Sequence, residues 1–163
     1  TPLGLDNVEI IQPSSSSSIV GRKDWVLTEK DKEMLRSAYM EVMKEQLENK
    51  GGYALVDQPD DDVLEISAII TAIAPSAPKD DNTSRGVGRT RVYTEGAGSM
   101  SIAVAYGDSE TGEVLGLAKD SRASNNTNFG INNSVTNRSD VRRMLSSWAA
   151  NIRVGLDRVH GKQ

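Results

Sequence analysis

Seven arginines in two predicted loops and at the start of a predicted helix are the side chains best suited to bind a charged group. A guanidinium offers a bidentate fork to phosphate and carboxylate groups. If the fold brings these segments to one end, the arginines form a patch for an anionic partner. The alternative is that they are spread over a solvated surface, where each contributes little. The candidate residues are Arg85, Arg89, Arg91, Arg122, Arg138, Arg142 and Arg143.

Five acidic residues at predicted turns and strand ends are candidates for hydrolysis by paired carboxylates. That chemistry needs two carboxyl groups at a defined separation within a cleft. The sequence shows neither, and acidic residues in turns are usually solvated. We therefore expect no enzyme activity and no catalytic residue. The five carboxylates are Asp57, Asp108, Glu110, Glu113 and Asp120.

Residues that bind metals or act as nucleophiles are scarce. The chain has no cysteine, which excludes disulfides, thiolate metal sites and cysteine nucleophiles. Its one histidine, His160, lies three residues from the C-terminus, where we expect a frayed and solvated side chain. The run Asp60-Asp61-Asp62 lacks the spaced ligands and the glycine of a calcium loop. We expect no metal and no cofactor.

The net charge of −4 is unevenly divided along the chain. Residues 1–81 hold 8 Lys and Arg against 16 Asp and Glu, whereas residues 82–163 hold 11 against 7. An acidic chain is not expected to have nucleic acid as its main partner. The difference between the halves indicates either two faces of opposite sign on one domain or a basic face for an anionic partner.

A chain of 163 residues is most simply one domain, residues 1–163. Aromatic residues make up only 4% of it, so the core must be built from aliphatic side chains and methionine. No apolar run approaches the roughly 20 residues of a membrane span. Two polar segments are predicted as loops: a Ser-rich loop over 12–24, with five consecutive serines, and an Asn-rich loop over 121–137.

The first half of the chain predicts a β-α-β unit. Val8–Ile11 is a short β-type run, and Thr28 is a good cap for a helix that ends at Gly51-Gly52. Tyr53–Asp57 is then predicted as a short strand. A right-handed crossover would connect the two strands in parallel.

The second half predicts an antiparallel meander and a closing helix. Alternation in Val63–Ile73 places Leu64, Ile66, Ala68, Ile70 and Ala72 on one face. Ser99–Tyr106 and Glu113–Asp120 are predicted to pair around a turn at Asp108–Gly112, and Gly116 and Ala118 to allow a helix to approach. A helix beginning near Asn137 or Ser139 carries an apolar stripe that places Trp148 against the sheet; the stripe is Val141, Leu145, Trp148, Ile152, Leu156 and Val159.

These elements predict an α+β fold in the form of a two-layer α/β sandwich. The sheet is expected to be mixed and mostly antiparallel, with four to six strands. Two long helices cover one face, because a sheet with alternating polarity buries only one side. The expected order is β-α-β-β-β(-β)-α.

The ordered set of segments in this chain resembles a bacterial family, the domain of unknown function number thirty-three thirteen, whose members are mostly predicted envelope lipoproteins. The resemblance covers about Val8 to Leu156. It is carried by Gly52–Asp57, Leu64–Ile73 with Thr71, Asp108–Leu115, Asp120-Ser121-Arg122, Asp140-Val141-Arg142 and Trp148-Ala149.

This resemblance implies a cell-envelope protein, exported to the periplasm and held at the outer membrane through a lipid-modified N-terminal cysteine. Residues 1–163 contain no cysteine, so such an anchor is absent from them. The resemblance implies no catalytic residues. The expected localisation is therefore periplasmic, with membrane contact only through that anchor.

Three hypotheses for function follow. The first is a non-enzymatic envelope domain that binds a protein or an anionic envelope component. The second is a periplasmic domain that binds a small ligand with the loops at 79–91 and 121–137. The third is a carboxylate-based hydrolase. A pocket with convergent polar groups would favour the last two.

Overall fold

The computed structural model describes residues 1–12, 24–75, 93–94, 98–123, 130–131 and 134–162. The serines at 14–18, and therefore most of the predicted Ser-rich loop, lie outside these residues. The elements are β1 (Glu9–Ile10), α1 (Glu29–Met43), the π-helix η1 (Lys44–Lys50), β2 (Leu64–Ala74), β3 (Tyr93–Thr94), β4 (Ser99–Asp108), β5 (Val114–Ala123), β6 (Gly130–Ile131) and α2 (Ser134–Val159).

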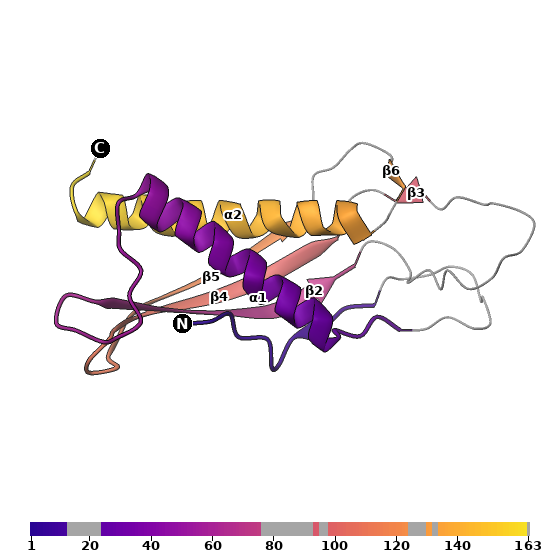
Figure 1. Ribbon diagram of the computed structural model, residues 1–163. Coiled ribbons are helices and arrows are strands. Elements are labelled where there is room, and N and C mark those ends of the chain that lie inside the picture. The colour runs from indigo at the N-terminus through magenta and orange to yellow at the C-terminus, as the bar shows by residue number, and fades with distance from the viewer. Residues whose placement is uncertain (13–23, 76–92, 95–97, 124–129, 132–133, 163) are drawn as a thin grey trace, which may run out of the picture.

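Two helices lie on one face of a four-stranded sheet (Figure 1). The strand order is β1-β2-β4-β5, with β1 parallel to β2 and the remaining pairs antiparallel. The short strands β3 and β6 pair separately. This two-layer α+β arrangement confirms the predicted fold class. It also makes β5 the strand at one edge of the main sheet.

Local sequence signals fix both ends of the first helix. Thr28 and Asp31 form a capping box, in which each side chain accepts from the other residue's backbone N–H. The helical path continues through η1 and ends at Gly52, whose φ of 67° favours glycine. The predicted cap and the predicted glycine stop are both confirmed.

Alternation along the central strands builds the face that the helices cover. Ala68 and Ile70 of β2 are buried, as are Ile102 and Val104 of β4. The predicted face of β2 is wrong near the end of the strand, because the register between β2 and β4 shifts between Ile70 and Ala72. A bulge of this kind changes which side chains point inward.

Beyond the bulge, Ile73 takes the core position predicted for Ala72. Ile73 pairs with Met100, which is 2% exposed, and packs against the core. The exchange turns a large aliphatic side chain toward the core, where Ile73 is partly buried.

The core is formed where α1 and α2 meet the sheet. Val42 of α1 and Leu145 and Trp148 of α2 are almost fully buried, as are Leu3 and Leu5 from the N-terminal segment. The prediction that Trp148 faces the sheet layer is confirmed by its 4% exposure. Val159 is 82% exposed, so the apolar stripe of α2 ends one turn earlier than predicted.

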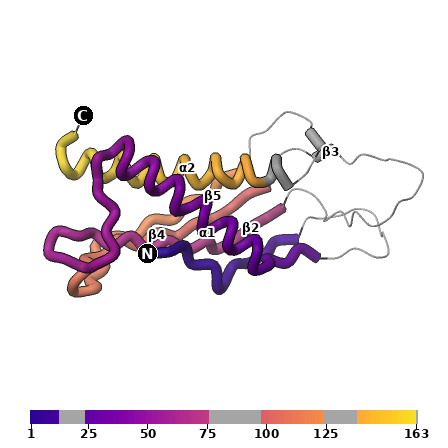
Figure 2. Tube along the Cα trace, in the orientation of Figure 1, coloured from indigo at the N-terminus to yellow at the C-terminus, as the bar shows by residue number. Residues whose placement is uncertain are grey.

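Three predicted boundaries differ from the structure. Tyr53–Asp57 forms no strand, and the parallel partner of β1 is β2. The long loop predicted over 121–137 is shorter, because β5 continues to Ala123 and α2 already begins at Ser134. Figure 2 shows the segment after η1 returning past the β4–β5 hairpin, at the end of the molecule where the C-terminus lies.

Candidate functional site

The structure describes four of the seven candidate arginines. Arg122 lies on β5, and Arg138, Arg142 and Arg143 lie on α2. The loop arginines at positions 85, 89 and 91 fall outside the described residues. The prediction that these arginines form one patch therefore stays a prediction.

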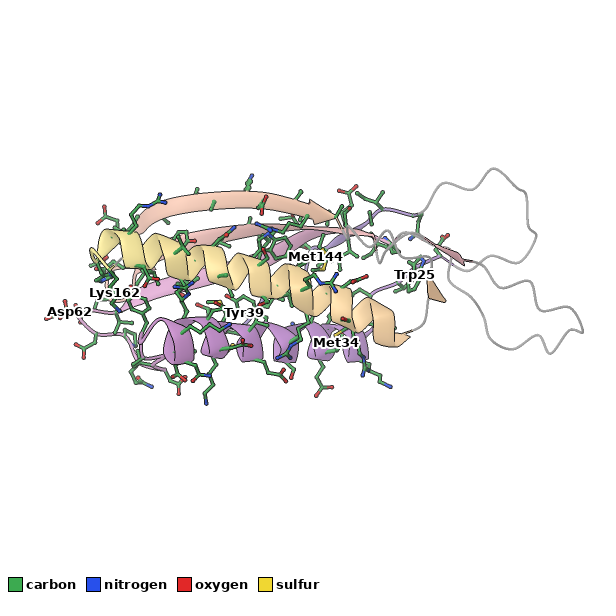
Figure 3. The ribbon with its side chains drawn as sticks, turned by 90° about the horizontal axis from the view of Figure 1, so that it is seen from above. Trp25, Met34, Tyr39, Asp62, Met144 and Lys162 are labelled. Atoms are coloured by element: carbon green, nitrogen blue, oxygen red, sulfur yellow. The ribbon has the colours of Figure 1, made fainter. Side chains whose placement is uncertain are left out.

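Three of the described arginines contact carboxylates. Arg142 forms an ion pair with Glu41 of α1. The Arg143 Nη1 atom lies 3.4 Å from an Asp140 carboxylate oxygen. Seen from above, α1 lies on one side of α2 and β5 on the other (Figure 3). The Arg142 pair therefore lies on the α1 side of α2, away from β5.

Arg122 belongs to a polar network that joins β5 to α2. Its Nε donates to Asp120 at 2.9 Å, and its Nη1 donates to the hydroxyl of Ser147 at 2.5 Å. The indole N–H of Trp148 also donates to Asp120, at 2.9 Å. These bonds, led by the one from Trp148, lower the pKa of the Asp120 carboxyl. The network holds the second half of β5 against the helix layer.

The five candidate carboxylates do not share a cleft. Asp57, Glu110 and Glu113 are exposed, whereas Asp120 is engaged with Trp148 and Arg122. Asp108 accepts the backbone N–H groups of residues 110 and 111 within the β4–β5 turn. The hydrogen bonds to Thr111, first from its backbone and then from its hydroxyl, lower the pKa of Asp108. Asp108 therefore stabilises a turn, and Asp120 joins a strand to a helix.

The best-defined hollows in the described part of the chain are shallow. One, of about 520 Å³, lies along the outer surface of α1 between Glu29 and Met40. Another, of about 100 Å³, lies at the base of the β4–β5 hairpin beside Glu65 and Ser67. Neither encloses convergent polar groups of the kind that hold a small ligand. No group of three or more metal-binding side chains occurs among the described residues.

No described helix or strand covers the sheet face opposite the helices, which we call the open face. The Thr1 hydroxyl contacts Glu65 and Ser67 at its margin, at 3.0 and 3.3 Å. Residues paired across neighbouring strands point to the same side of a sheet. Because Ala68, Ile70, Ile102 and Val104 point into the core, their neighbours point outward. The open face consists of the rows Ile69–Ala103–Lys119 and Ser67–Ala105–Leu117, with Glu65, Ser101 and Ser121 around them.

The open face is apolar at its centre. Ile69 is 50% exposed and Leu117 is 77% exposed, and Ala103 and Ala105 lie between their strands. Glu65 and Lys119 contribute opposite charges at its margin. Sequence reasoning missed this surface, because the pattern places Leu117 in a paired strand without indicating how far that strand is buried. The sequence signal was the pair of small residues Ala103 and Ala105 in β4. They leave the larger side chains of the neighbouring strands, Ile69 and Leu117, exposed.

A second cluster ties the end of α2 to the segment after η1. The Tyr53 hydroxyl donates to Asp157 at 2.9 Å, and Arg153 donates to the other oxygen of that carboxylate at 2.6 Å. The rings of Tyr53 and His160 lie 5.5 Å apart, and the Lys162 ammonium lies 3.8 Å from the Tyr53 ring centre. His160 is exposed as predicted, yet it is held in the last turn of the helix by its contact with the Leu156 carbonyl.

Comparison with known protein families gives one match that spans most of the chain. Residues 7–152 match the model of a family described as a protein of unknown function, DUF3313. The chain belongs to this family. The match confirms the resemblance that its ordered segments carry. In the second cluster, Tyr53 lies within the matched region, whereas Arg153, Asp157, His160 and Lys162 lie beyond it.

Three solved structures are similar to this chain at low sequence identity. A protein of the family of unknown function DUF330 from Xanthomonas campestris has 9% identity and a TM-score of 0.49, covering 93% of this chain and 81% of its own. A protein from Caulobacter crescentus, proposed to be a lipoprotein, has 14% identity and a TM-score of 0.41, covering 96% and 92%. The PelC dodecamer from Paraburkholderia phytofirmans has 9% identity and a TM-score of 0.40, covering 93% and 86%.

These identities are too low to transfer a function to this DUF3313 member. No curated protein matches the chain. No described helix has the length and apolar character that crossing a membrane requires.

Proposed function

We propose that this DUF3313 protein is a non-enzymatic component of the bacterial cell envelope that binds another protein through the open face of its sheet. In this proposal the domain works in the periplasm, held at the membrane by a lipid anchor, as the resemblance to envelope lipoproteins implies. Its partner is a protein rather than a small molecule or a nucleic acid.

The exposure of Ile69 and Leu117 on the open face is the observation that carries this proposal. An apolar centre with charged residues at its margin is the usual anatomy of a protein-binding surface. Because the side chains of Ala103 and Ala105 are small, a partner can pack closely against the backbone of β4. The hollows in the described residues are too open to favour a small ligand.

The proposal is tested by photo-crosslinking in the native bacterium. A benzophenone amino acid is placed at Ala105 on the open face, and a matched control carries it at Ser37, an exposed residue of α1. We expect a discrete crosslinked product at Ala105, identified by mass spectrometry, and no equivalent product at Ser37.

The same crosslinking position is then combined with Ile69→Glu. This substitution introduces a charge at the centre of the open face without removing a buried group, and the product is expected to disappear. Identical products at Ala105 and Ser37, or none at Ala105, would contradict the proposed function.

A further inference from the structure

The outer side of β5 is a free edge of the main sheet. β5 is ten residues long and is the last strand in the order β1-β2-β4-β5. In the part of the chain that the structure describes, no strand pairs with its outer side. A free edge exposes a row of backbone donors and acceptors that can pair with another strand.

The opposite edge of the sheet is protected by the N-terminal segment. The backbone of Gly4 donates to Ala68 at 2.8 Å and accepts from Ile70 at 3.1 Å. β1 then continues along β2, and the Ile11 N–H donates to Ile73 at 2.9 Å. The opposite edge of the sheet is therefore formed by the two-residue strand β1 and the N-terminal segment, which leaves β5 as the long edge strand.

The first half of β5 is apolar and separated from the helices. Val114, Leu115 and Leu117 are 60%, 62% and 77% exposed. Ala118 is also exposed, and a Cβ at Gly116 would meet only Tyr106 of the neighbouring strand β4, at 3.7 Å. The close approach of a helix predicted from the small side chains at 116 and 118 is therefore not made. The strand half before Lys119 offers its backbone edge and its exposed apolar side chains to a partner.

We propose that β5 pairs with β5 of a second copy of this chain, antiparallel, about a two-fold axis that passes beside Ala118. The inference does not depend on the open-face partner proposed above. Two-fold pairing is self-complementary, so one strand supplies both sides of the interface. It would join two four-stranded sheets into one continuous sheet, with the helices of both copies on the same side.

The charges along β5 are compatible with this register. With the axis beside Ala118, Leu117 lies opposite the second copy's Lys119, and Gly116 lies opposite the second copy's Asp120. Every charged residue of the central segment Gly116–Asp120 then faces an uncharged one. The methylene stem of Lys119 also covers part of the exposed Leu117.

The neighbouring registers are worse. An axis beside Lys119 brings two lysines together, and an axis beside Asp120 brings two aspartates together, and like charges directly opposite are destabilising. An axis beside Leu117 shortens the regular overlap, because the register of β5 shifts between Val114 and Gly116. A shift by one residue would set opposite faces of the two strands against each other.

One strand pair buries less than the roughly 1,600 Å² of a standard stable interface. We therefore expect a dimer whose population rises with protein concentration. Sedimentation velocity of the wild-type chain across a concentration series should show monomer converting to dimer. A chain that stays monomeric at the highest concentration would overturn the proposal.

The absence of cysteine from the chain allows a direct test of the register. Ala118→Cys places two cysteines opposite each other across the axis, where paired strands hold Cα atoms within the range that a disulfide spans. Mild oxidation should give a covalent dimer. The matched control is Ser121→Cys, whose two cysteines lie about 20 Å apart in this register, at about 3.4 Å per residue. Crosslinking of the control as strongly as Ala118→Cys would refute the register.

Charge variants at Leu117 distinguish specific pairing of two β5 strands from non-specific hydrophobic association. Leu117→Lys sets a lysine opposite the second copy's Lys119 and should abolish the dimer. Leu117→Glu sets a carboxylate opposite the same lysine and should retain it. Leu117 is exposed, so circular dichroism should show both variants folded. Equal loss of dimer in both variants would contradict pairing at this register and leave a different protein as the occupant of the edge.

Discussion

The indole N–H of Trp148 donates to the carboxylate of Asp120 over 2.9 Å, joining the centre of α2 to the edge strand β5. Trp148 is 4% exposed, whereas the Asp120 side chain is 47% exposed. One hydrogen bond thus connects the core with the surface. It also divides β5 into a half that is held by the helix and a half that is free.

Trp148→Ala should lower the free energy of unfolding by about 3–5 kcal/mol, the usual cost of removing a buried tryptophan. Trp148→Phe should cost less, because it keeps an aromatic ring in the core and loses mainly the donor to Asp120. Urea unfolding followed by circular dichroism measures both. Ser37→Ala on the outer face of α1 is the control and should change little. An unchanged melting temperature for Trp148→Ala would contradict the placement of this side chain.

The contribution of Asp120 should depend on pH. Its pKa is lowered in the folded protein, first by the Trp148 hydrogen bond and then by Arg122. A group with a lowered folded pKa stabilises the fold above its unfolded pKa, and that stability is lost as the pH falls through the folded pKa. Asp120→Asn should therefore be less stable than wild type at pH 7. The difference should shrink when unfolding is measured near pH 3, and a difference that grows in acid would contradict this assignment.

Removing the hydroxyl of Tyr39 should not destabilise the protein. Tyr39 is 3% exposed, and its hydroxyl has no hydrogen-bond partner among the described residues. Burial, with a smaller contribution from Tyr106, raises the pKa of this phenol to about 12. An unsatisfied buried polar group costs about 1–3 kcal/mol. Tyr39→Phe should raise the melting temperature, with Tyr53→Phe as the contrasting variant, since the Tyr53 hydroxyl is bonded to Asp157.

Two glycines should respond in opposite directions to alanine. Gly112 in the β4–β5 turn has a φ of 70°, which costs a residue with a Cβ about 1–2 kcal/mol. Gly155 lies inside α2 with open space around a Cβ, and alanine is favoured over glycine in a helix by about 1 kcal/mol. Thermal unfolding should show Gly112→Ala destabilised and Gly155→Ala stabilised. The same sign for both would contradict the backbone conformation at these two positions.

Local signals predicted the elements well, because each depends on neighbours in the sequence. The capping box at Thr28, the stop at Gly52 and the alternation that buries Ala68 and Ile70 of β2 are all of this kind. The burial of Trp148 is also predictable, because α2 can bury its apolar stripe against the sheet in only one orientation, and Trp148 belongs to that stripe.

What the sequence could not provide depends on long-range pairing. The β-type run Tyr53–Asp57 finds no partner, because β1 pairs with β2 instead. The bulge that brings Ile73 inward arises only when β2 is aligned with β4. The exposure of Leu117 follows from the position of β5 at the sheet edge, which is a property of strand order.

The candidate arginines can be tested against an anionic envelope surface. Arg138 is exposed, and the Arg142–Glu41 pair is a surface ion pair worth at most about 1 kcal/mol, so Arg142 is readily released to another anion. If the arginines serve the anionic envelope component of the first hypothesis, the purified chain should sediment with vesicles containing phosphatidylglycerol, and this binding should weaken as sodium chloride is raised. The double variant Arg138→Ala/Arg142→Ala should weaken it further. The control Lys30→Ala/Lys44→Ala makes the same change in net charge on α1 and its continuation, and equal weakening in both would assign the effect to overall charge and not to these arginines.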